Sequence, residues 1–368
     1  MEEEQEIIRF SKEHLEDYLS SVYKAKIRLI KVQELGVEKT ETQLKGFGYG
    51  KPYLIEFRLK DEVKRVVLET VKPSSFGHEH FSDRAKILLW QYSTFNKLPK
   101  HVKSIDVGAF TENGKLKSLG DCKEFFILTE AIEGRLYHAD LDEIIRNRKL
   151  SKLDLERCKT LAKYLVDIHS LKKDEPTLYI RRIRELIGHG ECIMGIIDNY
   201  PAGLKYADEK LLCSIEKKCV EWRWKLKKKT HRLSQVHGDF HPWNVMFRQG
   251  TDFTVLDRSR GEWGEPADDV TSMTINYIFY SLQAYGRLKG QFRTLFELFW
   301  KTYLNDSQDE EILNVVQPFY AWRALVVASP IWYPNLKAEV RMKLFNFIKN
   351  VLSTEKFDID DVNSYLED

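Results

Sequence analysis

The sequence lacks the features that mark membrane, secreted and zinc-binding proteins. Its 368 residues include only five cysteines, which form no Cys-x-x-Cys pair and belong to no His-rich zinc pattern. A scattered, odd set of cysteines is typical of a reduced, cytoplasmic protein. Apolar runs such as 324–328 are too short to span a bilayer, and the acidic start at 1–5 favours neither a signal nor a transit peptide. We therefore expect a cytoplasmic protein with no membrane partner.

An excess of one charge and internal repeats are also missing. The 58 basic and 56 acidic residues nearly balance, so no global field favours nucleic acid. One local basic run, 225–229, follows two tryptophans and could attract an anionic partner such as RNA. We favour an apolar stripe of Trp222 and Leu226 beside a solvated face, and expect no nucleic-acid partner. The length predicts two lobes, and the oligomeric state stays open.

The stretch 236–257 carries the chemistry that the sequence does offer. Asp239 is followed five residues later by Asn244, and Asp257 comes after a predicted hairpin of strands 245–247 and 253–255. Pairing of these strands would bring Asn244 and Asp257 to the same end of the hairpin, close to the loop with Asp239. Phosphoryl transfer needs such a set, with one carboxylate for the hydroxyl and an amide and a carboxylate for Mg²⁺.

The motif His237-Gly238-Asp239, with its Asn and second Asp, resembles the aminoglycoside phosphotransferase and choline kinase-like small-molecule kinases. The segment 264–270 matches the region that follows the metal Asp in that family. The resemblance implies a protein kinase-like α+β fold, with a small antiparallel sheet lobe at 1–133 and a helical lobe at 134–368. It also implies ATP or another nucleoside triphosphate, and Mg²⁺, as cofactors, Asp239 as the catalytic base, and Asn244 and Asp257 as metal ligands.

The resemblance assigns nucleotide contacts to the first lobe and the hinge. Alternate glycines, Gly46, Gly48 and Gly50, would let backbone N–H groups approach phosphate oxygens, although an ordinary flexible hairpin is the alternative. At the hinge, backbone groups near Glu130 and Ile132 would bond an adenine edge.

The first lobe departs from the family where a strand Lys normally holds the phosphates. Glu69 stands in its place, and Arg84 stands where the following helix usually carries the partner Glu. Three interpretations remain open: a swapped pair in which Arg84 faces the phosphates, a role for Lys72, or weak phosphate binding in a degenerate kinase.

Several further segments carry expectations. Residues 6–34 read as a leading helix, and 103–110 and 124–130 as the last strands of the first lobe. His169 and Asp269 are expected to have structural roles. Arg258 or Arg260 is expected either to neutralise charge on the transferred phosphoryl group or to pair with Asp268. The acidic stretch 305–311 resembles a solvated helix start. The break at 328–334 could bring Trp332 and Tyr333 to a pocket wall.

The resulting hypothesis is a phosphotransferase that uses ATP and Mg²⁺ on a hydroxyl of an aminoglycoside, sugar or amino-alcohol type of molecule. The alternative is a nucleotide-binding pseudokinase or regulatory protein with little transfer activity. The acceptor cannot be read from the catalytic set, because each of these molecules fits it.

Overall fold

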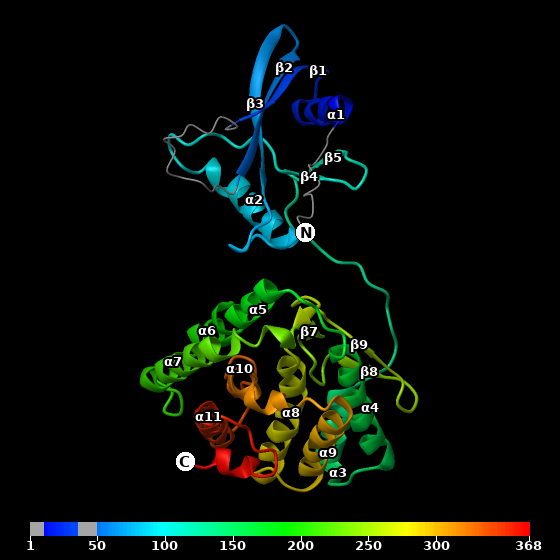
Figure 1. Ribbon diagram of the computed structural model, residues 1–368, viewed down its shortest axis with the longest axis vertical. Helices are drawn as coiled ribbons and strands as arrows, with labels where there is room; N and C mark the ends of the chain where they lie inside the picture. Colours follow the sequence, from blue (N-terminus) through cyan, green and yellow to red (C-terminus); the bar gives the residue numbers. More distant parts are fainter. Residues whose placement is uncertain (1–10, 36–49) are drawn as a thin grey trace. The chain divides into compact units, whose positions relative to one another are not determined.

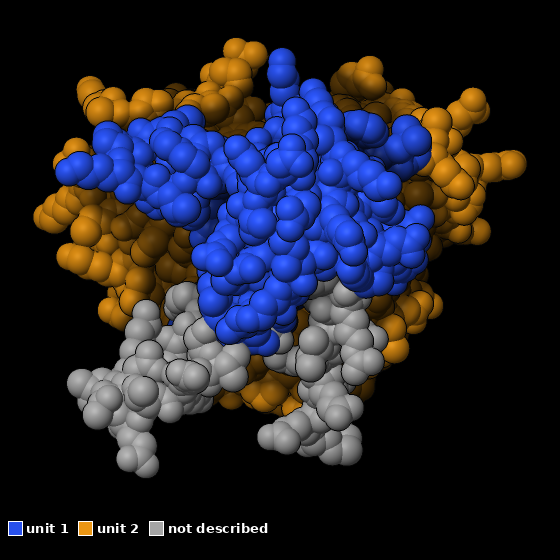
Figure 2. All heavy atoms as spheres, turned by 90° about the horizontal axis from the view of Figure 1, so that it is seen from above, with its two compact units in different colours: residues 1–129 blue, residues 130–368 orange. Residues whose placement is uncertain are grey.

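The computed structural model describes residues 11–35 and 50–368. The chain divides into two compact units, residues 1–129 and 130–368, which Figure 2 colours separately. The first contains an antiparallel sheet and the second is mainly helical, so the expected α+β class is confirmed. Within the described ranges, no helix combines the length and apolar character needed to cross a membrane.

The first unit is built on a three-stranded antiparallel sheet, with strand order β1-β2-β3. Its strands are β1 (Ile27–Glu34), β2 (Gly50–Leu59) and β3 (Glu62–Val71), and two helices, α1 (Lys12–Tyr23) and α2 (Phe81–Phe95), belong to the same unit (Figure 1). A small core forms where Leu15 and Leu19 of α1 meet Ile55 and Phe57 of β2. A short hairpin of β4 (Gly108–Phe110) and β5 (Leu116–Ser118) completes the unit.

Two expectations for this unit are wrong. The segment 27–34 is strand β1 and not part of the leading helix, because its alternating apolar residues pair with β2. The segment 124–130 forms no strand, and Phe126 and Leu128 are about nine-tenths exposed. A short apolar run satisfies the strand pattern by composition, but a strand also requires a partner for its backbone groups.

The second unit contains the remaining helices, drawn in green to red in Figure 1. In chain order they are α3 (Tyr137–Asn147), α4 (Lys152–His169), α5 (Pro176–Gly188), α6 (Ile193–Asp198), α7 (Glu209–Leu226), η1 (Thr230–Arg232), α8 (Pro266–Tyr285), α9 (Gly290–Ser307), η2 (Glu310–Asn314), α10 (Val316–Ala328), α11 (Ala338–Leu352) and η3 (Val362–Leu366). Helices α8 and α10 are buried over almost their whole length, as their nearly continuous apolar sequences predict.

Three short strand pairings lie among these helices. Strand β6 (Arg135–Leu136) pairs with β8 (Val245–Phe247), which pairs with β9 (Phe253–Val255). The predicted hairpin is therefore confirmed. Separately, β7 (Ser234–Gln235) pairs with β10 (Trp263–Gly264).

The end of α7, which is rich in aromatic and basic residues, has one apolar stripe beside a charged face, as the sequence predicted. Trp222 and Leu226 are buried, while Lys225 and Lys229 reach Glu355 and Glu311 at 2.7 and 2.5 Å. The stripe of two apolar residues beside a charged face is confirmed.

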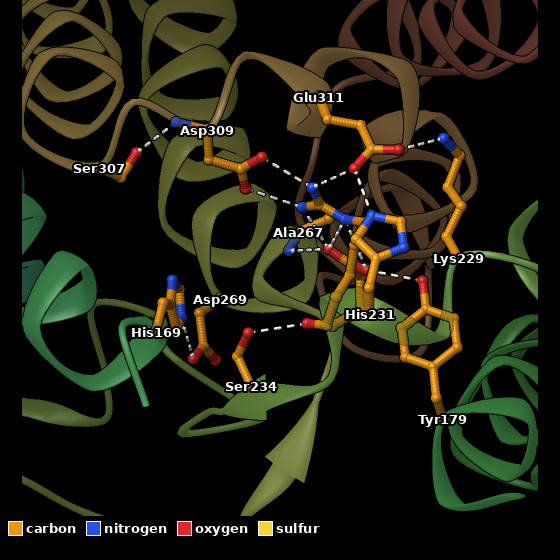
Figure 3. Close-up of polar contacts among 12 residues, drawn as sticks. His169, Tyr179, Lys229, His231, Ser234, Ala267, Asp269, Ser307, Asp309 and Glu311 are labelled. Carbon is orange, nitrogen blue, oxygen red and sulfur yellow. Dashed lines mark hydrogen bonds and ion pairs between the residues drawn. The ribbon is translucent and has the colours of Figure 1, made fainter. Parts of the chain in front are cut away.

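The acidic stretch 305–311 is more than a solvated helix start, so that expectation is wrong. Asp309 and Glu311 face the same buried guanidinium, that of Arg232, with Nη1 at 2.7 and 3.4 Å from their carboxylates (Figure 3). Arg232 also binds Glu265 at 2.8 Å, and Tyr179 donates to the same Glu265 at 2.7 Å. This network ties the start of α8 to η1 and η2.

We expect that replacing Arg232 by Met destabilises the second unit by about 3–5 kcal/mol, because Glu265 would stay buried without its cation. Chemical denaturation followed by tryptophan fluorescence measures the loss. The matched control is Arg248→Met, which breaks the solvent-exposed Arg248–Asp252 pair and should change stability far less. Equal losses in the two variants would show that burial of the network is irrelevant.

Candidate active site

The loop of residues 236–244 carries Asp239 between the β7–β10 pair and the β8–β9 hairpin. Val236 donates to the Glu262 carbonyl at 2.9 Å, which continues the β7–β10 pairing into the loop. Gly238 has a φ of +86°, in the left-handed region that favours glycine. The loop thus turns sharply just before Asp239.

Asp269, in the first turn of α8, holds this loop from behind. Its carboxylate accepts the backbone N–H groups of His237 and Gly238, each at 2.7 Å, and His169 Nε2 lies 3.1 Å away. Burial would raise the pKa of Asp269, but His169, His237 and these N–H groups outweigh it and keep the pKa below its usual value. Tyr303 holds the other nitrogen of His169 at 2.9 Å.

The side chain of Asp239 lies within a cluster of cationic and hydrogen-bonding groups. Arg323 Nη1 donates to its Oδ1 at 2.6 Å and Arg260 Nη1 at 3.1 Å, while His241 Nε2 lies 3.5 Å from Oδ2. Burial would raise the pKa of Asp239, but Arg323, His241 and Arg260 hold it far below the ordinary value. Asp239 is therefore ionised throughout the neutral and mildly acidic range.

Arg323 is a site residue that the sequence reasoning missed. It lies on α10, is almost fully buried, and joins Asp239 and Asp268 through separate Nη atoms, with a further bond to the Gly238 carbonyl at 3.1 Å. The available signal was the single charged residue in the mostly apolar segment 316–328, because a buried Arg requires anionic partners. Asp268 thus pairs with Arg323, and Arg258 donates to the carbonyls of Val236 and Glu262.

Asn244 and Asp257 flank the start and the end of the hairpin. Leu256 donates to the Asn244 carbonyl at 2.8 Å, which places Asp257 one residue beyond this bond. The Asn244 amide donates to the Asp239 carbonyl at 3.1 Å, which uses its nitrogen and leaves its side-chain oxygen available. The structure therefore brings together the three residues that the spacing predicted to converge.

The surroundings of the Asp257 side chain suit it to a role as a metal ligand. Its backbone is left-handed, with a φ of 54°, a conformation that Asp adopts more readily than most residues. Its carboxylate forms no hydrogen bond or ion pair with any described residue. The residue also lines a cavity of about 190 Å³ with His237 and Arg258, to which Asn244 and Asp239 do not contribute. An amide oxygen and an unpaired carboxylate are hard oxygen donors of the kind that Mg²⁺ prefers, so the residues fit this metal.

On the nucleotide side, Gly46 and Gly48 lie outside the described residues. Gly50 begins β2 opposite Val71, and a Cβ added there would lie 2.2 Å from a carboxylate oxygen of Glu69. A larger residue at position 50 would therefore require the Glu69 side chain to change its conformation.

The expected pair of Glu69 and Arg84 is not formed among the described residues. Arg84 Nη1 instead donates to the carbonyls of His78 and Glu79, at 2.9 and 3.0 Å, in the link before α2. Lys72 follows β3 and is exposed. Nucleotide roles for Arg84 and Lys72 remain predictions.

The predicted adenine contacts, Glu130 and Ile132, lie in an irregular segment before β6, where Glu130 is exposed and Ile132 half-buried. Their roles also remain predictions. In the loop of residues 236–244, Trp243 receives the ring edge of Tyr333, with centroids 6.4 Å apart, while Trp332 is mostly exposed.

Comparison with solved structures finds kinases of small molecules at low identity. An amicoumacin kinase in complex with AMP-PNP, Ca²⁺ and Ami is 13% identical, with 95% of this chain and 98% of that chain covered and a TM-score of 0.41. A choline kinase from Cryptosporidium parvum is 14% identical over 92% and 86%, with a TM-score of 0.33. An ethanolamine kinase from Plasmodium vivax is 14% identical over 95% and 82%, with a TM-score of 0.34. At these TM-scores the similarities carry no argument about the acceptor.

No curated relative matches the chain significantly in sequence. The profile of the phosphotransferase enzyme family (APH), however, matches residues 109–293, half of the chain. The match includes the loop with Asp239, the hairpin with Asn244 and Asp257, and the bracing residue Asp269. The family resemblance drawn from the motif is thereby confirmed, and with it the class of small-molecule phosphotransferase: this chain belongs to the phosphotransferase enzyme family.

Proposed function

We propose that the protein transfers the γ-phosphoryl group of ATP to a hydroxyl of a small molecule, with Mg²⁺ as the metal. The observation that carries the proposal is the convergence of Asp239, Asn244 and Asp257. One of these carboxylates is held by arginines, and the other has no partner among the described residues. Phosphoryl transfer depends mainly on positioning and charge neutralisation, which such a set supplies.

Asp239 would orient the acceptor. Its permanently ionised carboxylate accepts a hydrogen bond from the hydroxyl and directs that oxygen toward the γ-phosphorus. A bond forms from the hydroxyl oxygen to this phosphorus, and the bond from the phosphorus to the oxygen that bridges to the β-phosphate breaks. ADP leaves, and the hydroxyl proton passes to Asp239. Because the pKa of Asp239 is low, orientation is its main contribution and proton acceptance comes late.

Asn244 and Asp257 would hold Mg²⁺ through their side-chain oxygens. When bound, the metal neutralises charge on the phosphates. The Asn244 amide nitrogen is already used by the Asp239 carbonyl, so its oxygen keeps a fixed direction. Asp269 binds the backbone of the loop that carries Asp239 and thereby fixes the position of Asp239 relative to Asn244 and Asp257.

The nucleotide would bind through the first unit and the segment that follows it. Backbone N–H groups around Gly46, Gly48 and Gly50 would contact phosphate oxygens. Backbone groups near Glu130 and Ile132 would bond the adenine, and Arg84 or Lys72 would supply the cation that Glu69 cannot.

The second candidate, a nucleotide-binding protein with little transfer, is favoured by Glu69 and by the engagement of Arg84 with two carbonyls. It shares ATP binding with the proposed function and differs in the absence of a phosphorylated product.

The proposal is tested by calorimetric titration of ATP with and without Mg²⁺. We expect Mg²⁺ to strengthen ATP binding to the natural protein. Asp257→Asn should reduce this Mg²⁺-dependent gain in affinity by at least roughly tenfold, because even the loss of a residue that only hydrogen-bonds to a metal ligand lowers metal affinity by that much. Asp252→Asn is the matched control, because Asp252 is an exposed aspartate on the same hairpin. ATP binding that is independent of Mg²⁺ and of Asp257 would refute the assignment.

A further inference from the structure

Two guanidinium groups lie against the carboxylate that is proposed to receive the acceptor hydroxyl. We call Arg260 and Arg323 the guanidinium pair. Both donate to the same oxygen, Oδ1 of Asp239, and both stack on the ring of Trp322, with their central carbons 4.6 and 3.8 Å from its centroid. The stacking fixes the planes of both groups, so their positive charge stays at this point.

The two members of the pair differ in how completely their hydrogen bonds are used. Both Nη atoms of Arg323 are occupied, by Asp239, Asp268 and the Gly238 carbonyl, and only its Nε is buried without a partner among the described residues. Arg260 uses only Nη1, which donates to Asp239 and, at 3.4 Å, to the Gly238 carbonyl. Arg323 is therefore a positioning residue, whereas Arg260 retains binding capacity.

The unused side of Arg260 is the edge that binds oxyanions. Its Nε is buried without a hydrogen-bond partner, and no described residue accepts from its Nη2. The nearest carboxylate to this edge is that of Glu191, 3.6 Å from Nε, beyond hydrogen-bond length and still 63% exposed. The Nε and Nη2 atoms of an Arg form the fork that takes carboxylate or phosphate in a bidentate manner.

The balance of charge at this point disfavours a cationic acceptor. The guanidinium pair matches the negative charges of Asp239 and Asp268, and the further carboxylate near Arg260, that of Glu191, is 63% exposed and is therefore screened by solvent. A quaternary ammonium or amino group placed there would meet two fixed cations, and like charges at such range are repulsive. An oxyanion would meet the open fork of Arg260.

From these contacts we infer that the acceptor is a small hydroxy compound with an anionic group, carboxylate or phosphate, a short distance from its hydroxyl. Arg260 binds this group through its unpartnered Nε and Nη2 atoms and is the specificity-determining residue. The inference rests on the proposed function. It departs from the amino-alcohol and aminoglycoside acceptors, whose cationic groups the guanidinium pair would repel.

The test compares matched alcohols that differ only in charge. The first set is ethanolamine, ethylene glycol, glycolate and 2-hydroxyethyl phosphate, followed by sets with longer carbon chains in the same four forms. ADP formation from Mg–ATP by the full chain gives kcat and KM for each compound. We expect the carboxylate or the phosphate member to exceed the neutral member at least roughly tenfold in kcat/KM, as a charged hydrogen bond provides, and the cationic member to be the poorest. The two anionic arms distinguish a hydroxy acid from a phosphorylated alcohol.

Variants separate binding of the anionic group from other roles of Arg260. Arg260→Gln should raise KM for the anionic acceptor by roughly tenfold or more. The neutral alcohol also loses some activity, because Arg260 contacts Asp239, so the expected readout is a roughly tenfold fall in the ratio of kcat/KM for the anionic acceptor to kcat/KM for the neutral alcohol. Glu191→Gln should lower KM for the anionic acceptor, because it removes the competing carboxylate from a solvent-exposed position. Arg248→Gln, an exposed Arg of the hairpin, serves as the control.

Three outcomes would overturn the inference. The first is equal or better use of the cationic members. The second is an equal fall of kcat for all acceptors in Arg260→Gln, which would assign Arg260 to the transferred phosphoryl group. The third is stimulation of ADP formation by neutral or cationic members of the sets and by no anionic member. Loss of Mg–ATP binding, or intact binding with no stimulation by any alcohol of any set, would instead overturn the proposed function, so the two failures are distinguishable.

Discussion

Asp239→Asn is expected to lower kcat for phosphoryl transfer by roughly 10²- to 10⁴-fold, the range in which a positioned acid–base group contributes. Asparagine keeps the size of the side chain but presents a neutral group to the hydroxyl and to Arg260 and Arg323. ATP binding should change little, because Asn244 and Asp257 remain. Steady-state ADP formation at saturating ATP measures the effect.

The control for this variant is Asp252→Asn, an exposed aspartate on the adjoining hairpin, which should retain full activity. Thermal unfolding of both variants shows whether the loop still folds. If Asp239→Asn kept kcat within threefold of the natural protein on an accepted alcohol, Asp239 would not be the residue that orients the hydroxyl.

Arg323→Gln is the second variant with a large expected effect. Arg323 is the strongest of the cationic influences that hold the pKa of Asp239 far below its usual value against burial. Its removal should raise that pKa, so the acid side of the kcat–pH profile should move to higher pH. A carboxyl with a depressed pKa stabilises the fold above its unfolded pKa, near 3.9, and loses this contribution as pH falls through the folded value. The natural protein should therefore keep the contribution of Asp239 over the whole range from pH 5 to 8.

The same variant leaves Asp268 without its cation. Burial already raises the pKa of Asp268 to about 6, even with Arg323 opposing the rise. A carboxyl group whose pKa is raised by folding destabilises the fold at pH values above its folded-state pKa. This cost disappears as the pH falls toward the pKa of the group in the unfolded chain. We expect Arg323→Gln to lose about 3–5 kcal/mol of stability at neutral pH, as for other broken buried pairs, and to lose less at pH 5.

Denaturant titrations at pH 5 and 8, together with kcat over the same range, measure these effects. Arg323→Lys keeps the charge but lacks the second Nη atom, so it should restore part of the stability and less of the activity. An unchanged acid limb in Arg323→Gln, with only a uniform loss of stability, would mean that Arg323 acts as a fold residue and does not control Asp239.

The convergence of Asp239, Asn244 and Asp257 was predictable from the sequence because it is local. The turn at 249–252 and the flanking apolar triplets specify the hairpin, and the hairpin specifies that Asn244 and Asp257 meet. These relations involve about twenty neighbouring residues, and short-range turn chemistry determines them.

Long-range pairs were not predictable in this way. Arg323 reaches Asp239 from 84 residues along the chain, and Asp309 reaches Arg232 from 77. A sequence pattern can reveal that a buried charge needs a partner, but it does not identify the partner. The wrong prediction of a strand at 124–130 also reflects a long-range feature. The apolar composition of this segment can be read from the sequence, but the absence of a strand that pairs with it cannot.

The most direct measurement is ³¹P NMR of the full chain with Mg–ATP and the hydroxy acids of the matched sets. The account predicts a new phosphate monoester resonance that grows in equal amount to ADP, is lost when Mg²⁺ is chelated, and is lost in Asp257→Asn but not in Asp252→Asn. ATP that stays bound without reacting, or ADP that appears only with inorganic phosphate, would contradict transfer to a hydroxyl acceptor.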